Sequence, residues 1–278
     1  MLVALTFCNC IFCTFVAKPI EYAMKKKVFF VVATAMLMAV VSCRHHYEVV
    51  SVERSRILID GRWDAEPDAK AAQFLAPYKH DVDSVLGPIV GHVARNMTPD
   101  RPESAETNLL TDILMWASKA YGEQPVFGVY NTGGIRADLT RGAVTYGDVL
   151  DIAPFENKIA FLTMSGADVL ELFRQIAKRG GEGVSSAVRM VITKDGQLVS
   201  ATLNGEPIDE QKDYRVVTID YLLGGNDQMT AFTKGRDVNS PQETSNNTRF
   251  IIMDYFRAME KEGKVVDAQV EGRITIKE

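Results

Sequence analysis

The chain has 278 residues, of which 46% are hydrophobic, and a formal net charge of −5 at pH 7. This apolar content suffices for a packed core, which excludes a mainly disordered chain, and the negative charge excludes binding to a nucleic-acid polymer through bulk charge. The length suits one large domain or two small ones. The four cysteines are Cys8, Cys10, Cys13 and Cys43. The chain beyond residue 43 therefore forms no disulfide and no cysteine-ligated metal site.

The N-terminus carries the pattern of an export signal over residues 24–42. A basic stretch precedes an apolar run over 28–41, and the small residue Ser42 precedes Cys43. The run is too short for a comfortable transmembrane span. Its end resembles a bacterial lipobox, so we expect lipidation of Cys43 and a mature chain that starts there. An ordinary cleaved signal peptide and an uncleaved anchor are the alternatives.

This signal has its own methionine, Met24, so we interpret residues 1–23 as an extension from a start codon assigned too early. We expect the mature protein to be lipid-anchored in a bacterial cell envelope, facing the periplasm or the cell surface. The mature chain would then comprise a lead-in segment over 43–79 and one folded domain over 80–278.

Strands and helices are interspersed along the mature chain, which predicts an α/β-type domain. In chain order, the first half is predicted to hold a strand over 47–60, a helix over 66–78, an ambiguous and more extended segment over 82–97, a helix over 108–121 and a strand over 126–130. Ser104, with Thr107 three residues on, is the expected start of the 108–121 helix.

The second half is predicted to hold a short helix that ends at Ile152, a strand over 158–163, a helix over 166–180, strands over 188–193, 197–203 and 214–221, a helix over 246–262 and a strand over 273–277. The turn residues Lys194-Asp195-Gly196 predict a hairpin between the strands over 188–193 and 197–203.

Two of these strands end in glycine loops. Asn131-Thr132-Gly133-Gly134 and then Arg136 follow the strand over 126–130, and Gly224-Gly225-Asn226-Asp227 follow Tyr221. Ligands of open α/β sheets bind where strands end, and paired glycines let backbone N–H groups approach a ligand closely. An ordinary tight turn is the alternative reading of each glycine pair.

Between these loops lies Phe155, an aromatic residue that follows a proline rather than lying on a periodic apolar face. Two aromatic rings can sandwich a flat base, a carboxylate can accept hydrogen bonds from ribose hydroxyls, and a guanidinium can bind phosphate. Phe155, Tyr221, Asp227 and Arg136 together supply these groups. The alternatives are that both rings belong to the core and that Asp227 only forms a turn.

Five motifs occur in order along the chain: Asn-Thr-Gly-Gly-Ile-Arg-Ala-Asp (131–138), Gly-Asp-Val-Leu-Asp-Ile-Ala-Pro-Phe-Glu-Asn (147–157), Leu-Thr-Met-Ser-Gly-Ala-Asp-Val-Leu (162–170), Leu-Asn-Gly-Glu-Pro-Ile-Asp (203–209) and Tyr-Arg-Val-Val-Thr-Ile-Asp-Tyr-Leu-Leu-Gly-Gly-Asn-Asp (214–227). Together they resemble the C-terminal, substrate-binding domain of the 5′-nucleotidase family, which includes bacterial UDP-sugar hydrolases and animal ecto-5′-nucleotidase. The resemblance implies an α+β (mixed α/β) fold, with a mixed β-sheet flanked by helices, and a nucleotide or nucleoside ligand.

The resemblance implies that Asn131 contacts the base and that the backbone at Gly133 and Gly134 lines the nucleoside pocket. Arg136 would reach toward phosphate. The family's usual Asn-Gly-Gly-Gly is here Asn131-Thr132-Gly133-Gly134, which keeps the two glycines nearest the arginine.

Phe155 and Tyr221 would clamp the base, with Tyr221 in a place that phenylalanine usually occupies. Asp227 would hold the ribose hydroxyls, and Asn157 matches an asparagine of the bacterial members. A second phosphate-reaching arginine, often found after the 108–121 helix, has no clear equivalent near Gly122. The resemblance therefore supports base clamping better than a grip on phosphate.

Full-length members of the family carry an N-terminal metallophosphatase domain with a two-metal centre built from Asp-x-His, Asn-His-Glu and Gly-His-x-His motifs. The chain's histidines are His45, His46, His80 and His92, and Gly91-His92 lacks the second histidine of the last motif. We therefore expect no metal, cofactor or catalytic residue in this chain, and divalent metals in a separate metallophosphatase.

Two functions of different classes remain. The chain is either the nucleotide-recognition half of a split 5′-nucleotidase, with the metal-bearing half on a separate polypeptide at the same membrane, or a stand-alone nucleotide-binding lipoprotein without catalysis. A neighbouring metallophosphatase gene would favour the first, and its absence the second. A hydrolase active alone through unrecognised carboxylates is a third reading, and no paired acidic motif supports it.

Overall fold

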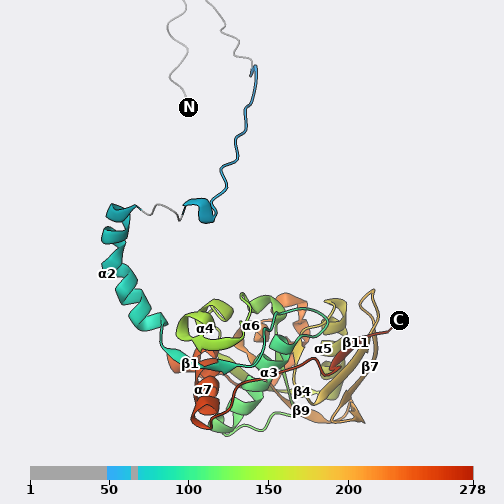
Figure 1. The fold of residues 1–278 in the computed structure, drawn as a ribbon. Helices are drawn as coiled ribbons and strands as arrows, with labels where there is room; N and C mark the ends of the chain where they lie inside the picture. Colours follow the sequence, from blue (N-terminus) through green and yellow to red (C-terminus); the bar gives the residue numbers. More distant parts are fainter. Residues whose placement is uncertain (1–48, 64–67, 278) are drawn as a thin grey trace, which may run out of the picture. The chain divides into compact units, whose positions relative to one another are not determined.

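A computed structural model describes residues 49–63 and 68–277 (Figure 1). The chain divides into two compact units, Met1–Glu66 and Pro67–Glu278. The predicted signal and Cys43 lie outside the described residues, and the division into 43–79 and 80–278 stays a prediction.

In the first unit, the strand predicted over 47–60 is wrong for its described part, because residues 49–60 form no regular element before the short 3₁₀ turn η1 (Gly61–Trp63). Apolar side chains here, such as Val49 and Ile59, are exposed. Alternating residues make a strand only when a neighbouring strand accepts their hydrogen bonds, and residues 49–60 belong to none of the sheets of the described chain.

The second unit begins with helix α2 (Ala69–Leu86), which extends the predicted helix by eight residues beyond 78. The Asp68 carboxylate caps it by accepting hydrogen bonds from the backbone N–H groups of Lys70 and Ala71. Gly87 is the C-cap and still donates its backbone N–H to the Asp83 carbonyl. The helix ends there because the next residue, Pro88, has no backbone N–H with which to continue the hydrogen-bond pattern. The prediction of a more extended backbone over residues 82–97 is therefore wrong for residues 82–86, which are helical. No residue of α2 is buried.

The strands of the described residues form three sheets (Figure 1). The five-stranded sheet has the order β10 (Arg236–Asn239), β4 (Ile159–Ser165), β9 (Asp213–Ile219), β2 (Phe127–Tyr130) and β5 (Gly183–Val184). The four-stranded sheet has the order β11 (Ile274–Ile276), β6 (Val188–Ile192), β7 (Leu198–Leu203) and β8 (Glu206–Pro207). The third sheet pairs β1 (Ile89–Val93) with β3 (Gly142–Thr145).

Parallel and antiparallel pairs coexist in these sheets. In the five-stranded sheet β2 and β9 are parallel, whereas β4 is antiparallel to β9. The hairpin predicted at Lys194-Asp195-Gly196 is confirmed, because β6 and β7 pair antiparallel on either side of it. Strands β3, β5, β8 and β10 were not predicted, and residues 142–145, which form β3, were expected to be part of a turn.

The remaining helices are α3 (Ala105–Ala117), α4 (Tyr146–Ile152), α5 (Gly166–Lys178), α6 (Asp220–Leu223) and α7 (Thr248–Lys261). Short 3₁₀ turns are η2 (Ser118–Tyr121), η3 (Thr132–Gly134), η4 (Asn226–Gln228), η5 (Thr230–Lys234) and η6 (Thr244–Asn246). Ser104 starts α3 as predicted, in a capping box with Thr107. The expected mixed sheet flanked by helices is confirmed.

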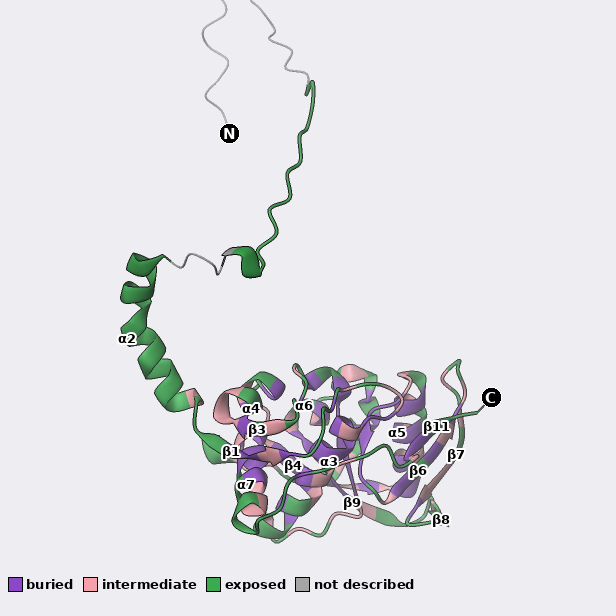
Figure 2. Cartoon of the chain, in the orientation of Figure 1, coloured by how far each residue is buried: buried purple, intermediate pink, exposed green. Residues whose placement is uncertain are grey.

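The core lies where α3, α5 and α7 pack against the strands, and its residues appear buried in Figure 2. Phe127 of β2 contacts Phe173 of α5 edge to face, with 5.4 Å between ring centroids. Strands β4 and β2 are almost wholly buried because they lie inside the five-stranded sheet. Among the helices of the described residues, none is long and apolar enough to cross a membrane.

Candidate functional site

Three chain segments lie at one end of the five-stranded sheet: one leads into β4, and the other two follow β9 and β2. Ile159, the first residue of β4, pairs with Ile219, the last residue of β9. The segment that leads into β4 and the helix α6 that follows β9 therefore meet. Strand β2 runs parallel to β9, with Phe127 opposite Val216, so its loop at Asn131 emerges at the same edge. This register brings together residues separated by up to about a hundred positions in the sequence.

A cavity of about 280 Å³ lies at this edge. It is lined by all of the predicted substrate-binding residues: Asn131, Gly133, Gly134, Arg136, Phe155, Asn157, Tyr221 and Asp227. The structure thus brings the whole predicted set to one cavity, and the roles of these residues in binding stay predictions.

Both aromatic side chains at the cavity are accessible. Phe155 is 47% exposed and Tyr221 is 39% exposed, so neither ring is a core residue and both can contact a ligand. Tyr221 lies in α6 rather than at the end of the predicted strand, because β9 ends at Ile219.

Backbone contacts hold the two ring-bearing segments together. The Lys158 backbone N–H donates to Asp220 Oδ1 at 3.0 Å, and the Asp220 N–H donates to the Lys158 carbonyl at 2.8 Å. The carbonyl of Asn157 accepts from the Thr248 N–H at the start of α7 at 2.8 Å. The positions of the two rings are therefore determined by the ends of β4, α6 and α7.

Asn131 and Asp227 contact each other across the cavity. The Asn131 side-chain amide donates to Asp227 Oδ2 at 2.8 Å. Asn131 Oδ1 is buried and has no hydrogen-bond partner among the described residues. Asp227 adopts left-handed backbone angles, φ 54° and ψ 30°. Such angles are uncommon outside glycine, although Asp tolerates them, and they occur often at binding sites.

The glycine pair of this loop serves two different purposes. A Cβ on Gly134 would lie 2.7 Å from Asn131 Oδ1, so only glycine leaves room for the Asn131 side chain there. A Cβ on Gly133 would meet nothing within 4 Å, because this backbone borders open space. The exposed Arg136 guanidinium lies beside it, with Nη1 donating to the Gly133 carbonyl at 3.3 Å.

A buried carboxylate that the sequence did not single out supports this loop from behind. Glu182 Oε2 accepts from the Thr132 backbone N–H at 2.6 Å, and Oε1 accepts from Arg101 Nη2 at 2.6 Å and Arg179 Nε at 2.5 Å. Arg179 Nη2 also lies 3.6 Å from Asp227 Oδ1. In the sequence, the only sign of this support is the glycine pair Gly180-Gly181 just before Glu182. In the structure Gly181 has a φ of 113°, and a Cβ there would lie 2.3 Å from the Pro102 carbonyl oxygen.

Two further buried groups lie near the start of α3 and the end of β2. Burial raises the pKa of the Glu106 carboxyl to about 8, and the charge of Asp138 adds to the rise. Burial likewise raises the pKa of Tyr130, the residue before Asn131, to about 12, a rise to which the charge of Glu106 adds. At neutral pH both side chains are mainly protonated, so they bring little charge to the buried side of the loop.

The described histidines do not gather with other ligating groups. His92 Nδ1 lies 2.9 Å from Glu260 Oε2 in a partly exposed pair, and His80 is exposed on α2. Within residues 49–63 and 68–277, no three His, Cys, Asp or Glu side chains form a group that could hold a metal ion. These residues do not fit a dinuclear metal centre, so we derive no hydrolytic step through one.

The arrangement can hold a flat ring between two aromatic side chains, a diol against a carboxylate and an anion near an exposed guanidinium.

A family model described as "5′-nucleotidase, C-terminal domain" matches residues 89–234. The cell wall protein Lmo0130 of Listeria monocytogenes is 27% identical over 74% of this chain and 29% of its own length. Protein UshA of Salmonella pullorum is 30% identical over 70% of this chain and 34% of its own length.

Solved structures agree with these relatives. The crystal structure of a 5′-nucleotidase precursor from Thermus thermophilus superposes with a TM-score of 0.64 and 25% identity, over 77% of this chain and 44% of that chain. This chain thus spans about a third of the length of the two sequence relatives.

Proposed function

This chain belongs to the 5′-nucleotidase C-terminal domain family, and on that premise we propose that it is the nucleotide-recognition part of a 5′-nucleotidase-type hydrolase. The observation that carries the proposal is the convergence of two accessible aromatic rings, an amide, a carboxylate and a guanidinium on one cavity. The ligand would be a nucleoside or nucleotide, which the chain would bind during nucleotide breakdown and phosphate release.

The base would lie between Phe155 and Tyr221. Base–aromatic stacking contributes about 1–3 kcal/mol per ring and does not depend on which base is bound. The cavity volume of about 280 Å³ is close to the lower end of small-molecule sites, roughly 300 Å³. That size suits a base with its ribose and leaves the phosphate outside.

The polar groups would orient the nucleoside. Asn131 would contact the base, and the Asp227 carboxylate would accept from the ribose hydroxyls. Arg136 would meet the phosphate at the open side, because its guanidinium is exposed. An exposed arginine gives a weaker grip than a buried one, so most of the affinity would come from the rings.

Hydrolysis would depend on a separate metallophosphatase polypeptide that supplies divalent metals and the attacking water. This chain's share would be to bind and orient the nucleotide. We further propose that a lipid on Cys43 holds the protein in a bacterial cell envelope; a cell wall protein among the relatives is in keeping with that location.

Calorimetry with adenosine, uridine and AMP tests the binding proposal. Phe155→Ala and Tyr221→Ala should each weaken nucleoside binding by about 1–3 kcal/mol. Phe74→Ala provides the matched control, because Phe74 is an exposed aromatic residue of α2 outside the cavity, and it should bind like the unchanged protein. Full affinity in both cavity variants would refute the clamp.

Phosphate release tests the division of labour. The purified chain with added divalent metals should release no phosphate from AMP, and a candidate metallophosphatase should do so faster when this chain is added. Metal-dependent turnover by this chain alone would contradict the proposal. Tight nucleotide binding with no effect on any partner would instead favour the stand-alone binding protein.

A further inference from the structure

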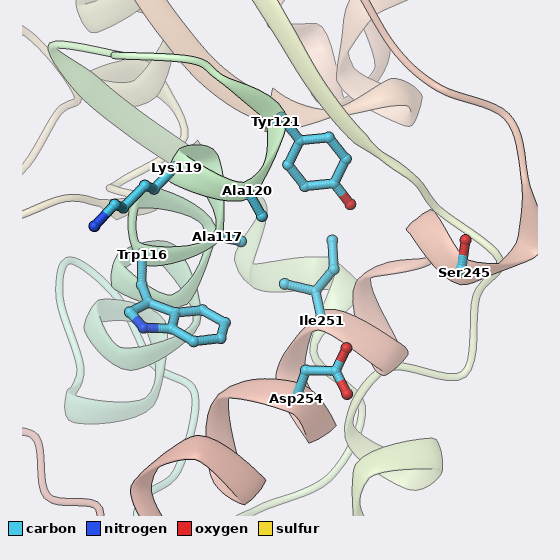
Figure 3. A pocket seen from close by; sticks show the side chains of 8 residues that line it. All are labelled: Trp116, Ala117, Lys119, Ala120, Tyr121, Ser245, Ile251 and Asp254. Atoms are coloured by element: carbon cyan, nitrogen blue, oxygen red, sulfur yellow. The ribbon is translucent and has the colours of Figure 1, made fainter.

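A second cavity, of about 490 Å³, lies between the end of α3 with η2 and the first half of α7 (Figure 3). Its volume falls within the range of small-molecule sites, roughly 300–1,000 Å³. It shares no lining residue with the nucleotide cavity. The residues that determine its chemistry are Trp116, Lys119, Tyr121, Ser245, Ile251 and Asp254.

The aromatic walls of this cavity are held in place from behind. The Trp116 ring contacts Tyr255 edge to face, with 5.2 Å between centroids. The Tyr121 ring packs on the buried Phe161 at 5.5 Å, and its hydroxyl donates to Asn246 Oδ1 at 2.9 Å. Both rings therefore present fixed surfaces, so that a ligand would lose little side-chain entropy on their account.

The charge inside the cavity is negative. The Asp254 carboxylate lies beside Ile251 at the open space between the rings, whereas the Lys119 side chain extends away from it (Figure 3). Asp254 forms an ion pair with Arg257 at 3.4 Å, and both side chains are exposed. An exposed ion pair contributes little free energy, so Arg257 competes only weakly with a ligand for the Asp254 carboxylate. Burial raises the pKa of the Tyr121 hydroxyl, and the charge of Asp254 adds to the rise, so this charge is felt at the opposite wall.

From this geometry we propose that the cavity binds an organic ammonium ion with an apolar or aromatic body. The ammonium group pairs with Asp254, and the body packs on Trp116 and Tyr121, whose ring faces also attract a cation. The Ser245 hydroxyl supplies an additional acceptor. Anionic ligands are disfavoured because they would meet the Asp254 carboxylate, whereas the side chain of the lining residue Lys119 extends away from the open space (Figure 3).

Tryptophan fluorescence reports on this cavity directly. The chain's two tryptophans are Trp63 and Trp116, so a Trp63→Phe background leaves Trp116 as the single reporter. The probes are phenethylammonium chloride and the neutral 2-phenylethanol, which have nearly the same shape. We expect a saturable change in Trp116 emission with both, and binding of the ammonium about twofold to fivefold tighter than the alcohol, as expected for one exposed ion pair.

The preference for the cation should depend on one carboxylate. Asp254→Asn should abolish it, whereas Glu260→Gln, which removes a charge from the same helix outside the cavity, should preserve it. Equal binding of the two probes by the unchanged protein, a preference that survives in Asp254→Asn, or no saturable response at millimolar probe would each overturn the proposal. Phe155→Ala should leave the titration unchanged, so this result is independent of the nucleotide site.

Discussion

Replacing Glu106 by glutamine should stabilise the protein, and the gain should grow with pH. The Glu106 side chain is fully buried in the first turn of α3, and neither carboxyl oxygen meets a donor at hydrogen-bonding geometry among the described residues. The backbone N–H of Leu139 opposes the rise in pKa only in part, since it already donates to the Met97 carbonyl. A charge at a helix N-terminus gains about 0.3–1 kcal/mol, which is too little to offset complete burial.

The size of the stability gain follows from the difference between the pKa of Glu106 in the folded protein, about 8, and its reference value of 4.5. Because the folded state holds this proton more tightly, the stability contributed by protonated Glu106 is complete below about pH 4.5. It is lost as the pH rises toward 8. At 1.36 kcal/mol per pH unit, the loss reaches about 3 kcal/mol at pH 7. Glutamine does not titrate, so the variant avoids this loss.

Urea unfolding of both proteins between pH 4.5 and 8 measures the difference. The free energy of unfolding of Glu106→Gln minus that of the unchanged protein should increase steadily across this range. Asp168→Asn is a control of opposite sign, because the Ser165 hydroxyl and then Lys234 lower the pKa of Asp168. Its deficit should be present throughout this range and should shrink only when the pH falls below about 4. A difference for Glu106→Gln that is flat with pH would refute the reasoning.

Gly134→Ala should reduce nucleoside affinity about tenfold, as expected for loss of about one hydrogen bond, because the new Cβ displaces the Asn131 side chain. Calorimetry measures the affinity, and an unchanged value would contradict the steric argument. Glu182→Gln should lower the free energy of unfolding by about 1–3 kcal/mol, since it leaves the partly buried Arg179 and Arg101 without their carboxylate. A change within error in urea unfolding would count against the role of Glu182 in supporting the loop. Cys43→Ser should move the protein from the membrane fraction to the soluble fraction of its cells, and retention in the membrane fraction would exclude a lipid anchor at Cys43.

Local patterns in the sequence were sufficient for the features that depend on neighbouring residues. Ser104 and Thr107 form the capping box that starts α3, and the glycine turn at Lys194-Asp195-Gly196 closes the β6–β7 hairpin. Each of these contacts joins residues a few positions apart, so their chemistry can be recognised in one short stretch. The set of residues that lines the cavity at Asn131 and Asp227 was also predictable, because ordered motifs along the chain resemble a known family.

Only the tertiary structure decided which distant groups meet. Glu182 supports the loop at Thr132 from fifty residues away, and Trp116 faces Asp254 across a cavity formed by two separate helices. Residues 49–60 alternate like a strand and yet belong to none of the described sheets. Glu106 occupies an ordinary first-turn position and yet is buried. Hydrogen-bond pairing and burial depend on which segments pack together, and no single stretch of sequence contains that information.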